Sequence, residues 1–458
     1  MRSVLIAAAL AAPLALAGPA FAAEPAPKPA KVQPVLKTVA ADVDAKALEA
    51  TIRSLVGFGT RHTLSDTTSD TRGIGAARRW TAARFATISK DCGGCLTVET
   101  PSKTFTGKRA PNGVEIVDVL GIQRGTTDPD RVVIIAGHID SRVNDVMDAT
   151  TDAPGANDDG SGVAAVLEAA RVLSKHKFPA TIVYAVLSGE EQGLFGGQLL
   201  AQTAKEKGWK VEADLNNDIV GNVHGIGGTV DRTHVRVFSE GTKAVETPEQ
   251  ANTRRYNGGE VDSPSRNLAR FMDGLADRYV KGLDVVMVYR TDRYGRGGDQ
   301  VPVLEAGYPA VRVTEAAEHY DRQHQTVRTE NGRAYGDVIE GVDFPYLAQV
   351  TRLNAVTLAA LASAPAPPSG VKIEGAVSAD TKVSWTAVPG AAGYRVWWRG
   401  TTEPRWSRAR AVGAETSTTL KNVVIDDWFF GVSSVGADGW ESPVVFPGAA
   451  GSFESVGK

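Results

Sequence analysis

Two apolar, β-branched runs frame the stretch that most constrains the fold of this chain. Residues 132–136 and 181–187 are typical of buried parallel strands, and residues 162–175 between them have the apolar spacing of an amphipathic helix. Two parallel strands joined through a helix form a β-α-β unit with a right-handed crossover. The sequence therefore predicts an α/β domain in which helices flank a mixed, mostly parallel central sheet.

Acidic and imidazole side chains gather where these strands end. Open α/β sheets bind ligands at this edge, and oxygen and nitrogen donors that converge there indicate a metal site. Crowded carboxylates repel one another unless a cation compensates them. Taken singly, the aspartates could be helix caps and the glutamates a solvated pair. Taken together, these residues favour a metal centre: His138, Asp140, Asp158, Asp159, Glu190 and Glu191.

The first residues of the chain predict export. Residues 1–22 combine Arg2, an apolar run over 4–17 and a small-residue cleavage site ending at Ala22, which is the pattern of a signal peptide. The apolar run is too short to make a good membrane span, and no later stretch is apolar enough to form one. We therefore expect a periplasmic or extracellular protein without a membrane anchor. The net charge of −3 gives no indication of nucleic-acid binding.

The two cysteines, Cys92 and Cys95, are expected to form a disulfide, because exported proteins mature in oxidising surroundings. A redox-active pair is the alternative, and two cysteines alone cannot complete a structural zinc site. Earlier in the chain, residues 23–40 are rich in Pro, Ala and Lys, which predicts a disordered linker.

Further sheet elements and helices are expected around the β-α-β unit. Alternating strands at 96–106 and 114–123 resemble an antiparallel hairpin that feeds the central sheet. The apolar patterns predict more strands at 211–219, 235–239, 283–289 and 310–314, and helices at 42–57, 75–89, 265–280 and 344–361.

A second unit follows a Pro-rich linker at 364–369. Residues 370–450 hold six of the eight tryptophans and have short strands at roughly ten-residue spacing, which predicts a small β-sandwich with its own core. The run VSWTAVPGAAGYRVWWR, followed by GVSSVGADGWESP, resembles a fibronectin type III domain. Such a module would contact a polymer or a protein surface.

Five motifs resemble those of one enzyme family. H-x-D at 138–140, GANDDGSG at 155–162, EEQG at 190–193, the aspartate of NNDIVGN and a late histidine follow one another in this order. They are similar to the motifs of the co-catalytic zinc aminopeptidases of metallopeptidase family M28, over roughly residues 48–362. The resemblance implies a peptidase domain of the zinc exopeptidase type over residues 41–363.

The resemblance also implies two zinc ions per chain. By this comparison His138, Asp158 and Asp218 would bind one zinc ion. The shared Asp158 would bind the second ion together with Glu191 and His324.

Three further residues receive roles from the same resemblance. Glu190 would act as the general base, and Asp140 would orient His138. Asp159 follows the bridging carboxylate, at the position that the family joins to it through a cis peptide bond.

The chain departs from the family pattern near the last ligand. Gln323 stands where a Tyr often precedes the last histidine, and no Asp follows four residues after it. His319 therefore remains a rival to His324 as the fifth ligand. The residue that stabilises the oxyanion stays open among three tyrosines: Tyr289, Tyr294 and Tyr320.

The combined expectation is a secreted metallo-aminopeptidase that acts on peptides with a free N-terminus. A hydroxide activated by two zinc ions would attack the peptide carbonyl, and Glu190 would be the general base. Alternatives on the same fold are a glutaminyl cyclase with one zinc ion and a dipeptidase or carboxypeptidase. A receptor-like ectodomain without catalysis is the non-enzymatic alternative.

Overall fold

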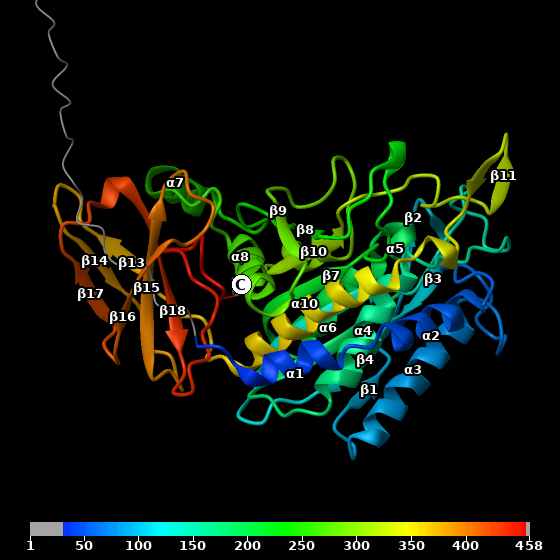
Figure 1. Cartoon of the computed structure of the whole chain (residues 1–458), viewed down its shortest axis with the longest axis horizontal. Helices are drawn as coiled ribbons and strands as arrows, with labels where there is room; N and C mark the ends of the chain where they lie inside the picture. Colours follow the sequence, from blue (N-terminus) through cyan, green and yellow to red (C-terminus); the bar gives the residue numbers. More distant parts are fainter. Residues whose placement is uncertain (1–30, 455–458) are drawn as a thin grey trace, which may run out of the picture.

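An eight-stranded sheet forms the centre of the computed structural model, which describes residues 31–454 (Figure 1). Its four middle strands are parallel to one another, and an antiparallel pair joins two further strands to them on each side. The two outer strands are antiparallel to each other on one side and parallel on the other. This arrangement confirms the predicted mixed, mostly parallel sheet. The spatial order is β1 (Thr97–Glu99), β4 (Val119–Gln123), β6 (Ala180–Leu187), β5 (Asp128–His138), β7 (Lys210–Asn217), β10 (Ala310–Glu315), β8 (His234–Phe238) and β9 (Asp284–Val288).

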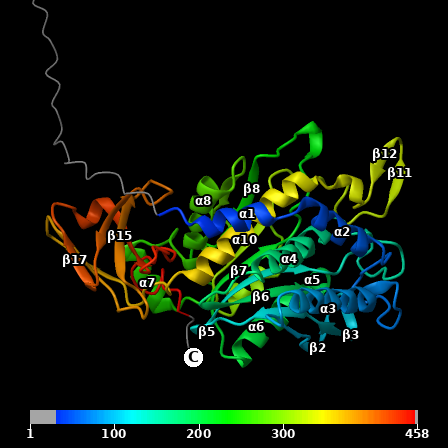
Figure 2. The ribbon, with the colours of Figure 1, turned by 60° about the horizontal axis from the view of Figure 1, so that its bottom comes forward.

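Helices cover both faces of the sheet, as the two-sided apolar character of β5 requires. Val133 and Ile135 of β5 face the larger core, and Ile134 faces the smaller one. Figure 2 shows α1, α4 and α10 side by side over the larger core. That layer contains α1 (Pro34–Asp42), α2 (Ala45–Val56), α3 (Gly73–Asp91), α4 (Gly160–Leu173), α8 (Pro264–Tyr279) and α10 (Phe344–Ser363). The opposite layer contains α6 (Phe195–Glu206) and α9 (Gln300–Glu305).

The helix α1 corrects the prediction of disorder over residues 23–40. Pro34 occupies the first turn, where a proline is tolerated, and Leu36, Val39 and Ala40 are buried. These three residues have the i, i+3, i+4 spacing of a helix face, and they pack toward α10. The Pro- and Lys-rich composition concealed this short apolar stripe. Residues 23–30 and the predicted signal peptide at 1–22 lie outside the described residues.

The predicted hairpin at 96–123 divides into two structures. β1 and β4 join the edge of the central sheet, while β2 (Ser102–Gly107) and β3 (Ala110–Val117) form a separate antiparallel hairpin. The disulfide between Cys92 and Cys95 directly follows α3, as predicted. Among residues 31–454, no helix is long and apolar enough to cross a membrane.

The C-terminal unit consists of two three-stranded antiparallel sheets, which lie at one end of the molecule in Figure 1. Trp385, Tyr394, Trp398 and Phe430 are buried in its separate core. One sheet contains β13 (Lys372–Glu374), β14 (Thr381–Ser384) and β17 (Ser417–Leu420). The other contains β16 (Arg408–Val412), β15 (Gly393–Gly400) and β18 (Trp428–Val435).

Buried charges attach this unit to α8. Arg399 donates from Nη2 to both carboxylate oxygens of Asp262, at 2.9 and 2.8 Å, and Arg270 donates from Nη1 to the same carboxylate at 2.8 Å. The side chains of Asp262 and Arg399 are almost completely inaccessible to solvent. Trp406 adds a hydrogen bond from its indole N–H to Asn267 at 3.1 Å. Because a buried ion pair is costly to break, the C-terminal unit and the unit with the central sheet hold a defined relative position.

Candidate metal centre

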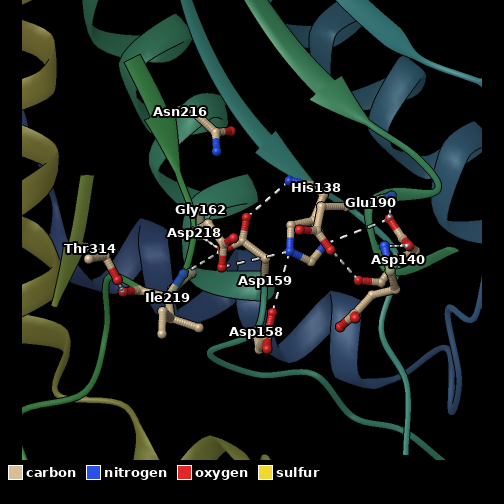
Figure 3. A network of polar contacts seen from close by, with 12 residues as sticks. His138, Asp140, Asp158, Asp159, Gly162, Glu190, Asn216, Asp218, Ile219 and Thr314 are labelled. Carbon is tan, nitrogen blue, oxygen red and sulfur yellow. Dashed lines mark hydrogen bonds and ion pairs between the residues drawn. The ribbon is translucent and has the colours of Figure 1, made fainter. Parts of the chain in front are cut away.

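Several of the predicted site residues meet at the carboxyl ends of three neighbouring parallel strands, and Figure 3 shows His138, Asp218 and Glu190 there. His138 is the last residue of β5, and Asp218 directly follows β7. Glu190 and Glu191 open the short helix α5 (Glu190–Gly193) after β6. Asp158 lies just before α4 and completes the set that reaches this edge.

Two groups of side chains share Asp158. In the first group, His138 Nε2 lies 3.4 Å from Asp158 Oδ1 and 3.9 Å from Asp218 Oδ1. In the second group, His324 Nε2 lies 3.0 Å from Asp158 Oδ2 and 2.9 Å from Glu191 Oε1. The two oxygens of Asp158 therefore face different groups.

The rival histidine, His319, lies apart from both groups. Its Nδ1 atom lies 4.0 Å from Asp321 Oδ2, and the side chain lines a small cavity together with Asp158 and Arg322. The structure thus brings His324 to the carboxylates, although His319 is nearer to the end of β10 in sequence. The three candidate tyrosines are all exposed: Tyr289, Tyr294 and Tyr320.

Asp140 fixes the turn that carries the two glutamates. Its carboxylate accepts hydrogen bonds from the backbone N–H groups of Gly189, Glu190 and Glu191 at 2.9, 3.3 and 3.1 Å. His138 Nδ1 lies 3.0 Å from the backbone carbonyl of Asp140, but 3.6 Å from its carboxylate. The carbonyl of Asp140 therefore orients the imidazole, while the carboxylate positions the glutamates.

Asp159 connects the end of β5, the start of α4 and the segment after β7. The peptide bond between Asp158 and Asp159 is cis. The Asp159 carboxylate accepts hydrogen bonds from the backbone N–H groups of His138 at 3.0 Å, Gly162 at 2.9 Å and Ile219 at 3.2 Å. Gly162 must be a glycine, because a Cβ atom there would lie 2.3 Å from Asp159 Oδ2 and 2.4 Å from a backbone oxygen.

Burial and neighbouring charges shift the proton affinities of the centre. Burial raises the pKa of the Glu190 carboxyl well above its ordinary value, and the adjacent Glu191 adds to the shift. Burial opposes protonation of His324, but Glu191 and Asp158 outweigh it and raise the pKa of the imidazole to about 10. His138 behaves in the same way, with burial outweighed by the surrounding carboxylates, and its pKa lies well above the ordinary value. The carboxylates of the centre therefore strongly favour the positively charged form of both histidines.

The donor set fits zinc. Imidazole nitrogens and carboxylate oxygens are zinc ligands, and the candidate ligand atoms within each group lie within 4.8 Å of one another. His138 Nε2 is buried, and among residues 31–454 it has no hydrogen-bond partner. A buried nitrogen that points at carboxylates without a hydrogen bond suits a metal ligand.

Sequence reasoning did not find the residues that hold the loop before α4. Asp337 accepts hydrogen bonds from Asn157 N at 2.9 Å and Asp158 N at 2.7 Å through its carboxylate, and from Ala156 N at 3.3 Å through its carbonyl. Arg61 is completely buried and donates to three backbone carbonyls of the neighbouring loop: Ile139, Pro154 and Gly155. Nothing in the local sequence around either residue indicates these distant partners.

Two further arginines contact the candidate ligands. Arg312 is buried in β10 and its Nη1 lies 2.6 Å from Asp218 Oδ2. Arg142 donates from Nε to Glu191 Oε2 at 2.7 Å. Both guanidinium groups hold a carboxylate oxygen that does not face the histidines, so they restrict the orientation of the carboxylates.

Replacing Asp337 with Ala should lower the free energy of unfolding by about 2–4 kcal/mol, because two buried N–H groups lose their acceptor. Urea denaturation of the variant measures the loss. Glu340→Ala is the matched control, because Glu340 is exposed in the same segment. Equal stability of the two variants would show that Asp337 does not support the Asn157–Asp158 backbone.

Known proteins resemble this chain along most of its length. Residues 118–342 match Peptidase family M28. A Leptosphaeria maculans protein named "Probable zinc metalloprotease" is 45% identical over 419 residues, which cover 90% of this chain and 96% of the relative. A Pyricularia oryzae protein of the same name is 42% identical over 422 residues, which cover 90% of this chain and 84% of the relative.

Solved structures share the fold at much lower identity. LapB from Legionella pneumophila superposes with a TM-score of 0.52 at 18% identity, covering 72% of this chain and 76% of that protein. The LapA aminopeptidase of the same organism gives a TM-score of 0.50 at 18% identity, covering 73% and 76%. These likenesses confirm the zinc-exopeptidase fold that the motifs indicated. Together with the sequence matches, they show that the chain belongs to peptidase family M28.

Proposed function

We propose that this protein is a zinc aminopeptidase that removes N-terminal residues from peptides. The observation that carries the proposal is the pair of ligand groups that share Asp158, with Glu190 beside them. The names of the relatives as zinc metalloproteases support the metal and the reaction class.

Five side chains would hold two zinc ions. His138, Asp158 and Asp218 form the first ligand set, and Asp158, Glu191 and His324 form the second. When bound, the ions would polarise the peptide carbonyl and supply a hydroxide at neutral pH. The adjacent glutamates divide two tasks, since Glu191 points to His324 and Glu190 is not part of either ligand set.

Glu190 would transfer the proton in this reaction. A general base works best when its pKa approaches the operating pH, and burial raises the pKa of this carboxyl. It would take a proton from the attacking water and deliver it to the leaving amine. Asp140 would keep Glu190 in place through the backbone hydrogen bond, and Asp159 would hold the strand end that carries His138.

Chelation tests this proposal and its rivals. The zinc-loaded chain should hydrolyse leucine p-nitroanilide, a chelator should abolish this activity, and added zinc should restore it, because the attacking hydroxide depends on the metal. Cyclisation of an N-terminal glutamine without hydrolysis would favour a glutaminyl cyclase. Release of C-terminal residues only would favour a carboxypeptidase, and inactivity on all substrates would favour a receptor-like role.

The ends of the chain support two further parts of the proposal. Residues 1–22 would direct export to the periplasm or the exterior, and N-terminal sequencing of the secreted protein should begin at Ala23. Retention of Met1 on the mature protein would contradict this.

Residues 370–450 would be a fibronectin type III-like module, since two antiparallel three-stranded sheets suit that architecture. The linker at 364–369 would join this module to the peptidase domain at 41–363. The module would contact a polymer or protein surface. Cosedimentation of the full chain with insoluble cellulose or chitin tests the polymer, and binding to neither would count against it.

A further inference from the structure

A cavity of about 750 Å³ lies beside the disulfide, where α3 and α4 pack against each other and both end. Cys92 and Cys95 form part of its lining, and both residues are half-buried. The helix α4 begins beside Asp158 and ends at Leu173, so a helix of roughly 20 Å separates this cavity from the candidate metal centre. The disulfide therefore borders a space that the proposed peptidase function does not use.

The turn that carries the two cysteines is closed by backbone hydrogen bonds as well as by the disulfide. Gly93 donates to the carbonyl of Lys90 at 3.1 Å, and Gly94 donates to the carbonyl of Ser89 at 2.7 Å. Both glycines have a positive φ, which glycine adopts without strain. Because the cysteines are only three positions apart, the S–S bond removes little conformational entropy from the unfolded chain. The stabilisation that this bond adds is therefore small, and the turn should persist when the bond opens.

The lining of the cavity carries an excess of positive charge. Four cationic side chains line it together with a single carboxylate, that of Asp91: Arg124, Arg171, Lys175 and Lys177. The carbonyl oxygens of Leu173 and His176 at the end of α4 accept hydrogen bonds from Gln123 Nε2, at 3.3 and 2.7 Å, so they do not offset this charge. The cavity is therefore suited to an anion.

Arg124 and Lys177 are the cations that remain available. Arg171 and Lys175 already form ion pairs, at 2.6 and 3.0 Å, with carboxylates outside the lining. Arg124 and Lys177 are exposed, and within residues 31–454 neither has a hydrogen-bond or ion-pair partner. Both can bind a carboxylate without breaking an existing contact.

We propose that a small thiol bearing a carboxylate binds in this cavity and exchanges with the disulfide between Cys92 and Cys95. Arg124 and Lys177 hold the carboxylate near the two sulfur atoms, since all four residues line the same space. Thiol–disulfide exchange at this place goes beyond the proposed peptidase function and does not depend on it.

Two thiols complete the exchange. The first thiol loses its proton to water, and its thiolate forms a bond to Cys95 Sγ while the bond between the two Sγ atoms breaks. Cys92 is the leaving group, because the backbone N–H of Cys95 donates to Cys92 Sγ at 3.2 Å and stabilises a thiolate there. A second thiolate attacks the sulfur of the bound thiol and releases Cys95. The cysteines take up two protons and are reduced, and the two small thiols leave as one oxidised disulfide.

Reduction of the full chain by a matched pair of thiols tests the inference. Mercaptoacetate carries a carboxylate, and mercaptoethanol is neutral. Each rate constant is divided by that of the same thiol with hydroxyethyl disulfide, which cancels the difference in intrinsic nucleophilicity. At low ionic strength the normalised rate for mercaptoacetate should be roughly fivefold higher, since a charge pair at a protein surface contributes about that factor. The ratio should approach one at about 1 M salt, where the Debye length shrinks to about 3 Å.

Substitutions assign the preference to the two cations. Arg124→Gln and Lys177→Gln should each lower the ratio, and the double variant should bring it close to one while the rate with mercaptoethanol stays unchanged. Lys281→Gln is the matched control, because Lys281 is exposed next to β9, at the opposite edge of the central sheet. Alkylation of free thiols followed by mass spectrometry gives every rate, and the chain has no other cysteine.

Three results would overturn the inference. The first is an equal normalised rate for both thiols in the wild type, and the second is a preference that persists in the double variant. The third is the absence of reduction by either thiol. None of these measurements involves zinc or peptide hydrolysis, so failure of this inference is distinct from failure of the proposed peptidase function.

Discussion

Glu190→Gln is expected to reduce kcat by roughly 10²–10⁴-fold while the zinc content stays unchanged, because general acid–base catalysis typically contributes that factor. The amide keeps the shape of the side chain but cannot accept the proton of the attacking water. Glu190 is in neither candidate ligand set, so its loss removes no ligand. The backbone N–H of Glu190 still reaches Asp140 in the variant, so the turn is retained.

Glu191→Gln is the matched control at the adjacent position. Its carboxylate faces His324 at 2.9 Å and is held by Arg142 at 2.7 Å, so its neutralisation should weaken zinc binding. Inductively coupled plasma analysis of both variants, together with kcat on leucine p-nitroanilide, separates the two roles. If Glu190→Gln lost zinc and Glu191→Gln kept it, the division of roles between the glutamates would be reversed.

His324→Ala should remove one zinc ion per chain and abolish hydrolysis, because the second ligand set would lose its imidazole and the reaction would lose the Lewis acid that this set would hold. His324 Nε2 lies close to both Asp158 and Glu191, so its removal leaves only these two carboxylates in the second ligand set. Zinc content after gel filtration and the rate on leucine p-nitroanilide give the two readouts.

His319→Ala provides the comparison within the same segment. His319 lies beside Asp321 and Arg322 and belongs to neither ligand group, so its replacement should leave the zinc content unchanged and alter the rate modestly at most. A variant pair with the opposite phenotypes would move the fifth ligand to His319 and require a different path for the chain after β10.

The middle of the central sheet could be predicted from sequence because its strands are buried on both faces. Residues 132–136 of β5 and most of β6 are apolar runs, and such runs leave few alternatives once a helix of suitable length separates them. The candidate ligands follow from the same regularity, since His138 and Asp218 end neighbouring parallel strands. Their positions at the ends of these two strands therefore place both residues at the same edge of the sheet.

The contacts that depend on tertiary packing could not be predicted in this way. Asp337 is 179 residues from Asp158, and Arg399 is 137 residues from Asp262. A charged side chain is usually solvated, so neither Asp337 in its loop nor Arg399 in β15 has a local pattern that indicates burial against a distant partner. The helix α1 was missed for a related reason, because its three buried residues are stabilised by α10 rather than by local propensity.

Zinc stoichiometry tests the central claim most directly. Metal-free protein should be titrated with zinc while bound zinc and hydrolysis of leucine p-nitroanilide are followed together. The two ligand groups that share Asp158 predict that full activity is reached at two zinc ions per chain. Full activity at one zinc ion per chain, with no further binding, would contradict a di-zinc peptidase.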